Sequence, residues 1–142
     1  MKIKIIFIIL LLLIISAYIS VKNRNEGLII NNKKIELLIA NNDYLRQKGL
    51  SDRESIPENT AMLFVFDKAD KYGFWMKDMK FPLDIVWLNE KKEIVYLLQN
   101  IKPDTYPDTF FPIDNAMYII EFNAGFSEKN NIKVGNVLNF KI

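Results

Sequence analysis

Short apolar segments separated by turn-forming residues run through most of the chain after residue 27. Runs of five to seven apolar residues fit β-strands and are too short for typical amphipathic helices. Asn, Gly, Pro and charged residues lie between the runs and indicate turns. We expect strands at residues 28–30, 35–40, 61–66, 74–76, 83–88, 94–98, 116–122 and 137–141.

Helix signals are sparse in the same region. Asn42 is a suitable N-cap for a helix over residues 43–48, and Gly49 is suited to end it. A single helical turn fits residues 127–131. The fold class predicted is mainly β: a single compact antiparallel sheet, barrel-like, with one short helix. Residues 51–59 and the proline-containing stretch 100–115 are expected to be loops.

The N-terminus carries a membrane or export signal. Lys2 and Lys4 precede an apolar run over residues 5–21, which as a helix would span roughly 25 Å, the lower limit for crossing a bilayer. The pattern also fits a secretory signal peptide. A cleavage site needs two small residues that lie two positions apart. Within residues 16–20, every pair with this spacing contains Tyr18 or Ile19, which favours an uncleaved anchor. We therefore divide the chain into residues 1–22, signal anchor or signal peptide, and residues 23–142, the β domain.

Both interpretations place the domain outside the cytoplasm. The lysines before the run favour a cytoplasmic N-terminus, which leaves the domain in the periplasm or on the cell surface. The expected partner of residues 5–21 is the membrane. If the signal is cleaved, the domain is secreted.

Composition excludes several classes of function. The chain has no Cys and no His, so disulfides, Cys nucleophiles, Ser-His-Asp triads and Cys/His zinc sites are impossible within it. Without Lys2 and Lys4, 17 basic residues balance 17 acidic ones. A balanced domain has no overall field that attracts nucleic acid, so no nucleic-acid partner is expected. Asp104, Asp108 and Asp114 lack the spacing of an EF-hand, and we predict no metal and no cofactor.

Several ordered motifs together resemble one family. They begin with Gly49-Leu50-x-x-Arg53 and residues 62–66 (Met-Leu-Phe-Val-Phe), and continue with residues 74–77 (Phe-Trp-Met-Lys), 82–85 (Pro-Leu-Asp-Ile), 116–125 (Ala-Met-Tyr-Ile-Ile-Glu-Phe-Asn-Ala-Gly) and 134–136 (Val-Gly-Asn). This order is similar to that of the DUF192 family, also called UPF0127, over roughly residues 35–142. The resemblance implies a small β-rich domain, often exported, with no generally assigned biochemical activity.

Charged residues at the family's polar positions form a candidate ligand-binding or structural polar cluster. Its members are Arg53, Lys77, Asp78, Asp84 and Glu121. The favoured interpretation is structural: Arg53 would form a buried pair with Asp84 or Glu121. The alternative is that the cluster lines a pocket for a polar ligand. Two departures from the family pattern bear on the cluster, since Asp78-Met79 replaces the usual Asn-Thr and Asn136 replaces a closing Asp.

Aromatic residues supply a second candidate surface. Its members are Trp75, Trp87, Tyr106, Phe110 and Phe111. Rings with a few fixed polar groups bind sugars or peptides, although most of these rings are expected in the core.

The sequence favours a non-enzymatic, membrane-tethered envelope module that binds a ligand or partner. The partner is an envelope polymer, a small ligand or another protein, and the expected contacts are residues 75–84 and the loop 103–115. A first alternative is an enzyme acting on an envelope polymer, hydrolase-like, through Lys77, Asp84 and Glu121; its catalytic residues stay unassigned. A second alternative is a structural accessory subunit of a membrane complex.

Overall fold

A single seven-stranded sheet forms the body of the domain. The computed structural model describes residues 9–16 and 27–142. The strands are β1 (Gly27–Ile30), β2 (Lys33–Ala40), β3 (Thr60–Asp70), β4 (Leu83–Leu88), β5 (Ile94–Ile101), β6 (Ala116–Asn123) and β7 (Phe140–Lys141). The named helices are α2 (Asp43–Lys48), the 3-10 helix η1 (Pro103–Thr105) and α3 (Phe126–Lys129). The prediction of a mainly β fold is confirmed.

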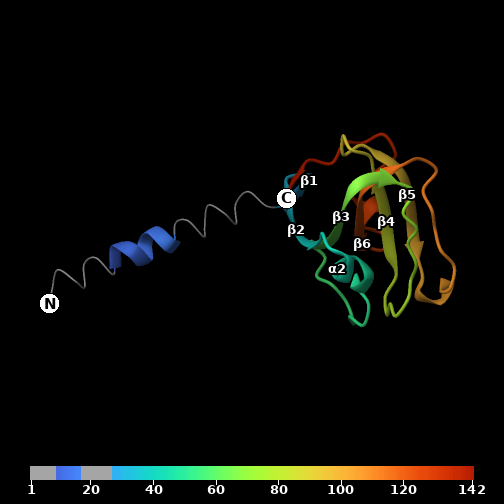
Figure 1. Cartoon of the computed structure of the whole chain (residues 1–142), viewed down its shortest axis with the longest axis horizontal. Helices are drawn as coiled ribbons and strands as arrows, with labels where there is room; N and C mark the ends of the chain where they lie inside the picture. The colour runs from blue at the N-terminus through green and yellow to red at the C-terminus, as the bar shows by residue number, and fades with distance from the viewer. Residues whose placement is uncertain (1–8, 17–26) are drawn as a thin grey trace.

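The strand order is β5-β4-β6-β3-β2-β1-β7, and Figure 1 shows the first six of these strands side by side. All neighbours are antiparallel except β2 and β3, which run parallel. The prediction of an antiparallel sheet is therefore wrong for this pair. The physical reason is the connection, because residues 41–59 include α2 and return the chain to the same end of the sheet.

Backbone hydrogen bonds link the two ends of the strand order. Ile94 N donates to Asn136 O over 2.8 Å, and Leu138 N donates to Lys92 O over 3.0 Å. Residue 93 forms an isolated bridge with residue 137. The segment before β7 thus pairs with the start of β5, while β7 itself pairs with β1. The strand expected at 137–141 is consequently divided, and only Phe140–Lys141 is regular.

Local signals explain most element boundaries. The Asn42 side chain accepts a 2.9 Å hydrogen bond from Leu45 N, and α2 ends at Gly49 with a positive φ, as predicted. Asn31 and Asn32 both have positive φ values, which gives the tight turn between β1 and β2. In contrast, residues 74–76 form no strand, and Phe74 makes only an isolated bridge with Phe110.

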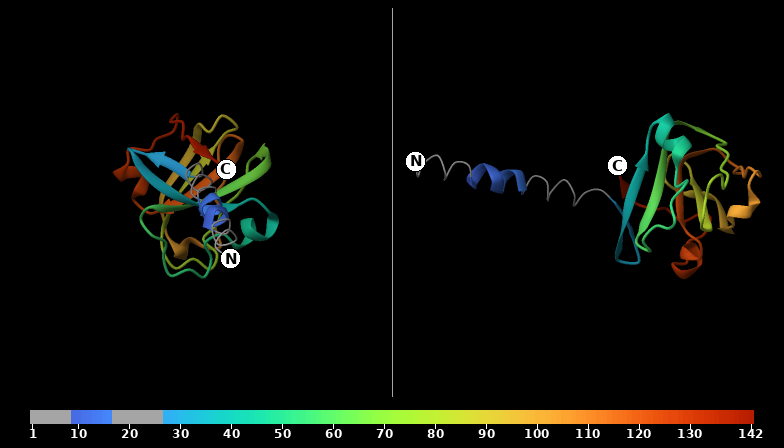
Figure 2. Two further views of the ribbon diagram at one scale, coloured as in Figure 1. Left: turned by 90° about the vertical axis from the view of Figure 1, so that its left-hand side faces the viewer. Right: turned by 90° about the horizontal axis from the view of Figure 1, so that it is seen from below.

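Apolar side chains cover both faces of the sheet. One cluster includes Leu63, Val86 and Phe122, and the other includes Met62, Phe64 and Ile85. Alternation along each strand assigns successive residues to opposite faces, so one strand supplies both clusters. β4 is buried throughout for this reason. The helices α2 and α3 lie on opposite sides of the domain, as Figure 2 shows.

The N-terminal apolar run falls only partly within the described residues. Residues 9–16 are helical, whereas residues 5–8 and 17–21 lie outside the described ranges, as do the candidate cleavage positions after Ser16. No helix in the described part of the chain has the length and apolar character needed to span a bilayer.

Candidate functional site

Glu121 is a buried acidic residue in the middle of β6. Its neighbours across the sheet are Met62 of β3 and Ile85 of β4. The residue is only 4% exposed, and its Oε2 atom has no hydrogen-bond partner. Burial away from water raises the pKa of the carboxyl group to about 8. At neutral pH this group is therefore mostly protonated.

A cavity of about 380 Å³ opens beside Glu121. β3 contributes Phe64 and Phe66, and the connection between β3 and β4 contributes aromatic and basic residues. α2 and the turn after it close the other side. The lining consists of Asp43, Arg46, Gln47, Lys48, Gly49, Leu50, Ser51, Phe64, Phe66, Tyr72, Gly73, Phe74, Trp75, Lys77, Met79 and Glu121. The volume is within the range of small-molecule sites.

The aromatic walls are held by ring contacts. Phe64 and Phe74 meet edge to face with centroids 4.7 Å apart, and Phe66 and Tyr72 stack with centroids 3.5 Å apart. The backbone groups of Phe74 and Phe110 exchange hydrogen bonds of 2.9 and 2.8 Å, which fixes the chain beside the cavity. These contacts make the cavity a preformed feature of the fold.

Arg46 anchors α2 to the aromatic wall. Its guanidinium carbon lies 5.0 Å from the Phe66 ring centroid, and Nη1 donates to Val65 O over 2.6 Å. Nη2 donates to Asp43 Oδ1 over 2.7 Å. The guanidinium is thus already occupied by a carboxylate, a carbonyl and a ring.

The mouth of the cavity carries Trp75 and Lys77. Trp75 is 48% exposed. The Lys77 side chain is exposed and has no hydrogen-bond or ion-pair partner among residues 9–16 and 27–142. A smaller cavity of about 230 Å³ shares both residues and also contacts Asp78. Nearby Lys48 is paired with Asp52, so Lys77 is the unpaired cation of this rim among the described residues.

The predicted polar cluster does not form one group. Lys77 and Glu121 line the same cavity, and Asp78 lies beside it. Asp84 is on the opposite face of the sheet, where its carboxylate accepts hydrogen bonds from Asn100 N, Gly125 N and Ser127 N at 2.9, 3.1 and 2.8 Å. Arg53 is exposed and pairs with neither sheet carboxylate. The predicted buried pair is therefore wrong.

The two departures from the family pattern have local explanations. Asp78 has a φ of 55°, a conformation that Asp and Asn both tolerate, and its carbonyl accepts a hydrogen bond from Asp52 N. Asn136 Oδ1 accepts a 2.9 Å hydrogen bond from Lys133 N. An amide oxygen fills the acceptor role of a carboxylate oxygen in this turn, so the substitution preserves the contact.

The predicted aromatic surface is also divided. Trp87 is fully buried and donates from Nε1 to Tyr72 O over 3.0 Å, so it belongs to the core. Tyr106 and Phe111 are about half exposed and do not line the cavity, while Phe110 is half-buried. Trp75 alone among the five lies in the cavity wall.

Several lining residues were not identified from the sequence. Phe64 and Phe66 lie at alternate positions from Met62 and so share a face with it, a pattern that was readable in residues 60–66. Arg46 and Tyr72 gave no such signal, because their positions depend on how α2 and the turn after β3 pack onto the sheet.

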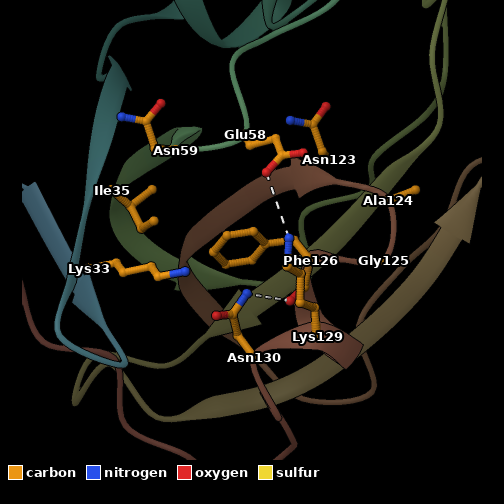
Figure 3. A pocket seen from close by; sticks show the side chains of 10 residues that line it. All are labelled: Lys33, Ile35, Glu58, Asn59, Asn123, Ala124, Gly125, Phe126, Lys129 and Asn130. Carbon is orange, nitrogen blue, oxygen red and sulfur yellow. Dashed lines mark hydrogen bonds and ion pairs between the residues drawn. The ribbon is translucent and has the colours of Figure 1, made fainter.

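A second cavity of about 340 Å³ lies between β2, α3 and the end of β6. Figure 3 shows the Phe126 ring in its centre, with Lys33 and Asn130 beside it. Several of its polar side chains are already partnered: Lys129 pairs with Glu58 at 3.7 Å, Asn130 donates to Phe126 O, and Asn123 donates to Ile56 O. Among the described residues, no side chain that lines this cavity has a buried polar atom without a hydrogen-bond partner. This distinguishes it from the cavity beside Glu121.

The fold and site together define a small β-rich domain with an aromatic-lined cavity against a buried carboxyl group. The DUF192 family model, described as "Uncharacterized ACR", matches residues 26–140. The chain therefore belongs to the DUF192 family, as its motifs predict. No curated protein sequence matches the chain.

Two crystal structures resemble the domain. A protein of unknown function from Novosphingobium aromaticivorans DSM 12444 is 21% identical with a TM-score of 0.72, and the match covers 76% of each chain. A candidate transcription regulator from Sinorhizobium meliloti 1021 is 23% identical with a TM-score of 0.73, and the match covers 80% of this chain and 89% of that one. At these identities the likeness establishes a shared fold.

Proposed function

We propose that this protein is a membrane-tethered, extracytoplasmic binding module, with a barrel-like domain that holds a small ligand in the cavity beside Glu121. The observation that carries the proposal is that Glu121 lines an aromatic cavity while its buried Oε2 atom has no hydrogen-bond partner. A buried polar atom without a hydrogen bond costs the fold on the order of 1–3 kcal/mol. A ligand that supplies the missing partner recovers this free energy on binding.

Binding accounts for the arrangement better than catalysis does. The enzyme alternative requires Lys77, Asp84 and Glu121 to converge, and Asp84 faces the other side of the sheet with its oxygens already occupied. Proton transfer between two groups needs them within hydrogen-bond reach of a common substrate atom. One carboxyl group among aromatic rings instead suits recognition, in which rings give contact area and a single polar group fixes orientation.

The location rests on the N-terminal sequence. The apolar run 5–21 follows Lys2 and Lys4, which favours a cytoplasmic N-terminus and an external domain. A protease added to intact spheroplasts should degrade the domain. Full protection of the domain would contradict an external location.

A fluorescence screen of the full chain tests the binding role. Trp75 lies at the cavity mouth and Trp87 in the core, so a ligand in the cavity should change the emission of Trp75 alone. We expect one class among sugars, amino acids, short peptides and small amines to give a saturable change. The change should disappear in Trp75→Phe.

Glu121→Leu is the decisive variant for this screen, because it removes the polar atoms while keeping an apolar group of similar size. It should abolish binding and leave the melting transition intact. Binding that survives Glu121→Leu, or a screen without any saturable ligand, contradicts the proposal.

A further inference from the structure

We propose that the ligand of this cavity is a small organic cation carrying an ammonium group, which forms an ion pair with Glu121. This inference rests on the proposed binding function and names its ligand class. It follows from the charge balance of the cavity, from the chemistry of its walls and from the position of Glu121, the buried carboxyl group in its lining.

The charge balance leaves Glu121 without a counter-ion. Among the charged residues that line the cavity, Arg46 pairs with Asp43 and Lys48 pairs with Asp52. Desolvation is the cause of the raised Glu121 pKa, and no neighbouring cation offsets it. A buried carboxylate becomes favourable only when a cation enters beside it. An ammonium ligand supplies that charge beside Glu121, whereas an anion would be attracted only by the exposed, solvated Lys77 at the rim, away from the buried carboxyl group.

The aromatic walls suit the same ligand. Rings of Phe64, Phe66, Tyr72, Phe74 and Trp75 line the cavity. The negative faces of such rings attract ammonium groups, and cages of this kind bind quaternary ammonium ions. The Phe66 ring is already occupied, because it stacks with Tyr72 and the Arg46 guanidinium lies over it. A ligand cation would contact Phe64, Phe74 or Trp75 instead. Burial raises the pKa of the Tyr72 hydroxyl, so this ring stays neutral across the physiological range.

The remaining positive charge is at the rim. The exposed Lys77 side chain is solvated, and water and salt screen its repulsion of an entering cation. Glu121 is buried, so its attraction acts through a medium of lower dielectric constant than water. The buried attraction therefore exceeds the exposed repulsion.

Proton release is a necessary consequence of this assignment. The Glu121 O–H bond breaks as the cation enters, the proton passes to the solvent, and the carboxylate retains the electron pair. The pKa of Glu121 in the ligand-free protein is about 8. The fraction of protein molecules with an ionised Glu121 therefore falls about tenfold for each pH unit below that value. Cation affinity should therefore rise on the order of 50- to 100-fold between pH 6 and pH 9.

The test compares choline with its neutral isostere 3,3-dimethylbutan-1-ol by calorimetry on the full chain. Choline is permanently charged, so the protein alone titrates. We expect choline to bind at least about tenfold more tightly than the alcohol at pH 8.5 and to show the predicted rise with pH. Glu121→Gln should remove the preference and the pH dependence. Glu128→Gln is the matched control, because Glu128 is exposed on α3 and outside the cavity, and it should bind as wild type.

Equal affinity for the two probes, a preference for the alcohol, or unchanged choline binding in Glu121→Gln would overturn the cation assignment. Absence of binding by both probes would also overturn it. These results leave the proposed binding role standing if the wider fluorescence screen still finds a ligand that requires Glu121.

Discussion

Asp84 and Glu121 lie on neighbouring strands, one register position apart, and face opposite sides of the sheet. Asp84 is opposite Phe122, whereas Glu121 is opposite Ile85. Since residues directly opposite each other share a face, the two carboxyl groups enter different environments. Asp84 meets three backbone N–H groups, and Glu121 meets an aromatic cavity. The Asp84 carboxylate therefore has its hydrogen-bond partners within the fold, whereas the Glu121 carboxyl group keeps a buried oxygen without one.

Glu121→Gln should flatten the pH dependence of stability. The folded-state pKa of Glu121 is raised from 4.5 to about 8, so the folded protein binds this proton more tightly than the unfolded chain. The resulting stabilisation is complete below pH 4.5 and is lost as the pH rises toward 8, by at most on the order of 4–5 kcal/mol. Urea unfolding at pH 5, 6, 7 and 8 measures it. Parallel profiles for wild type and variant would show that Glu121 does not titrate abnormally.

Asp84→Asn should destabilise the domain by roughly 3 kcal/mol. The amide places an N–H group where the carboxylate accepts hydrogen bonds, so at least one of the backbone donors of Asn100, Gly125 and Ser127 loses its charged acceptor. Urea unfolding gives the magnitude, and faster amide exchange at these three residues gives the location. Asp78→Asn is the control and should change stability by less than about 0.5 kcal/mol, because Asp78 is exposed. Equal effects of the two variants would contradict the role of Asp84 as the acceptor for these three backbone N–H groups.

Arg53→Ala should change the free energy of unfolding by less than about 0.5 kcal/mol. Arg53 is exposed and has no ion-pair partner in the described part of the chain. The sequence alone suggested a buried pair, whose loss would cost about 3–5 kcal/mol. A thermal melt separates the two values clearly. A large loss of stability in Arg53→Ala would indicate that Arg53 does form a buried ion pair.

The two tryptophans should respond differently to substitution. Trp87→Phe should cost about 2–3 kcal/mol, because Trp87 is fully buried and its Nε1 donates to Tyr72 O. Trp75→Phe should leave stability nearly unchanged, because the ring is half exposed and a smaller ring leaves no cavity in the core. Urea midpoints measure both. A larger loss for Trp75→Phe than for Trp87→Phe would contradict the assignment of core and cavity mouth.

Local rules predicted the parts of the fold that depend on neighbouring residues. The two ends of α2 were predicted from Asn42 and Gly49, because capping involves groups within one turn of the helix. The apolar runs gave the central strands because alternation is a property of each strand. The parallel pairing of β2 and β3 was missed, because it depends on the path of the chain through α2 and not on either strand alone.

The candidate site was predicted only in part, for a related reason. Lys77 and Glu121 were identified from family positions, and both line the cavity. Arg53 was placed wrongly because sequence gives the charge of a residue but not the direction in which its loop leaves the sheet. Arg46 and Tyr72 were missed because their contact with the cavity arises from tertiary packing onto β3.

The most direct test of the central claim is a fragment screen on the isotope-labelled full chain, observed by NMR. We expect bound fragments to shift the Trp75 indole resonance and the Glu121 carboxyl resonance together, with the residues around Lys33 and Phe126 unaffected. Fragments that shift only the Lys33–Phe126 cavity, or none that shift Glu121, would contradict the claim that the carboxyl group beside the aromatic cavity is the binding site.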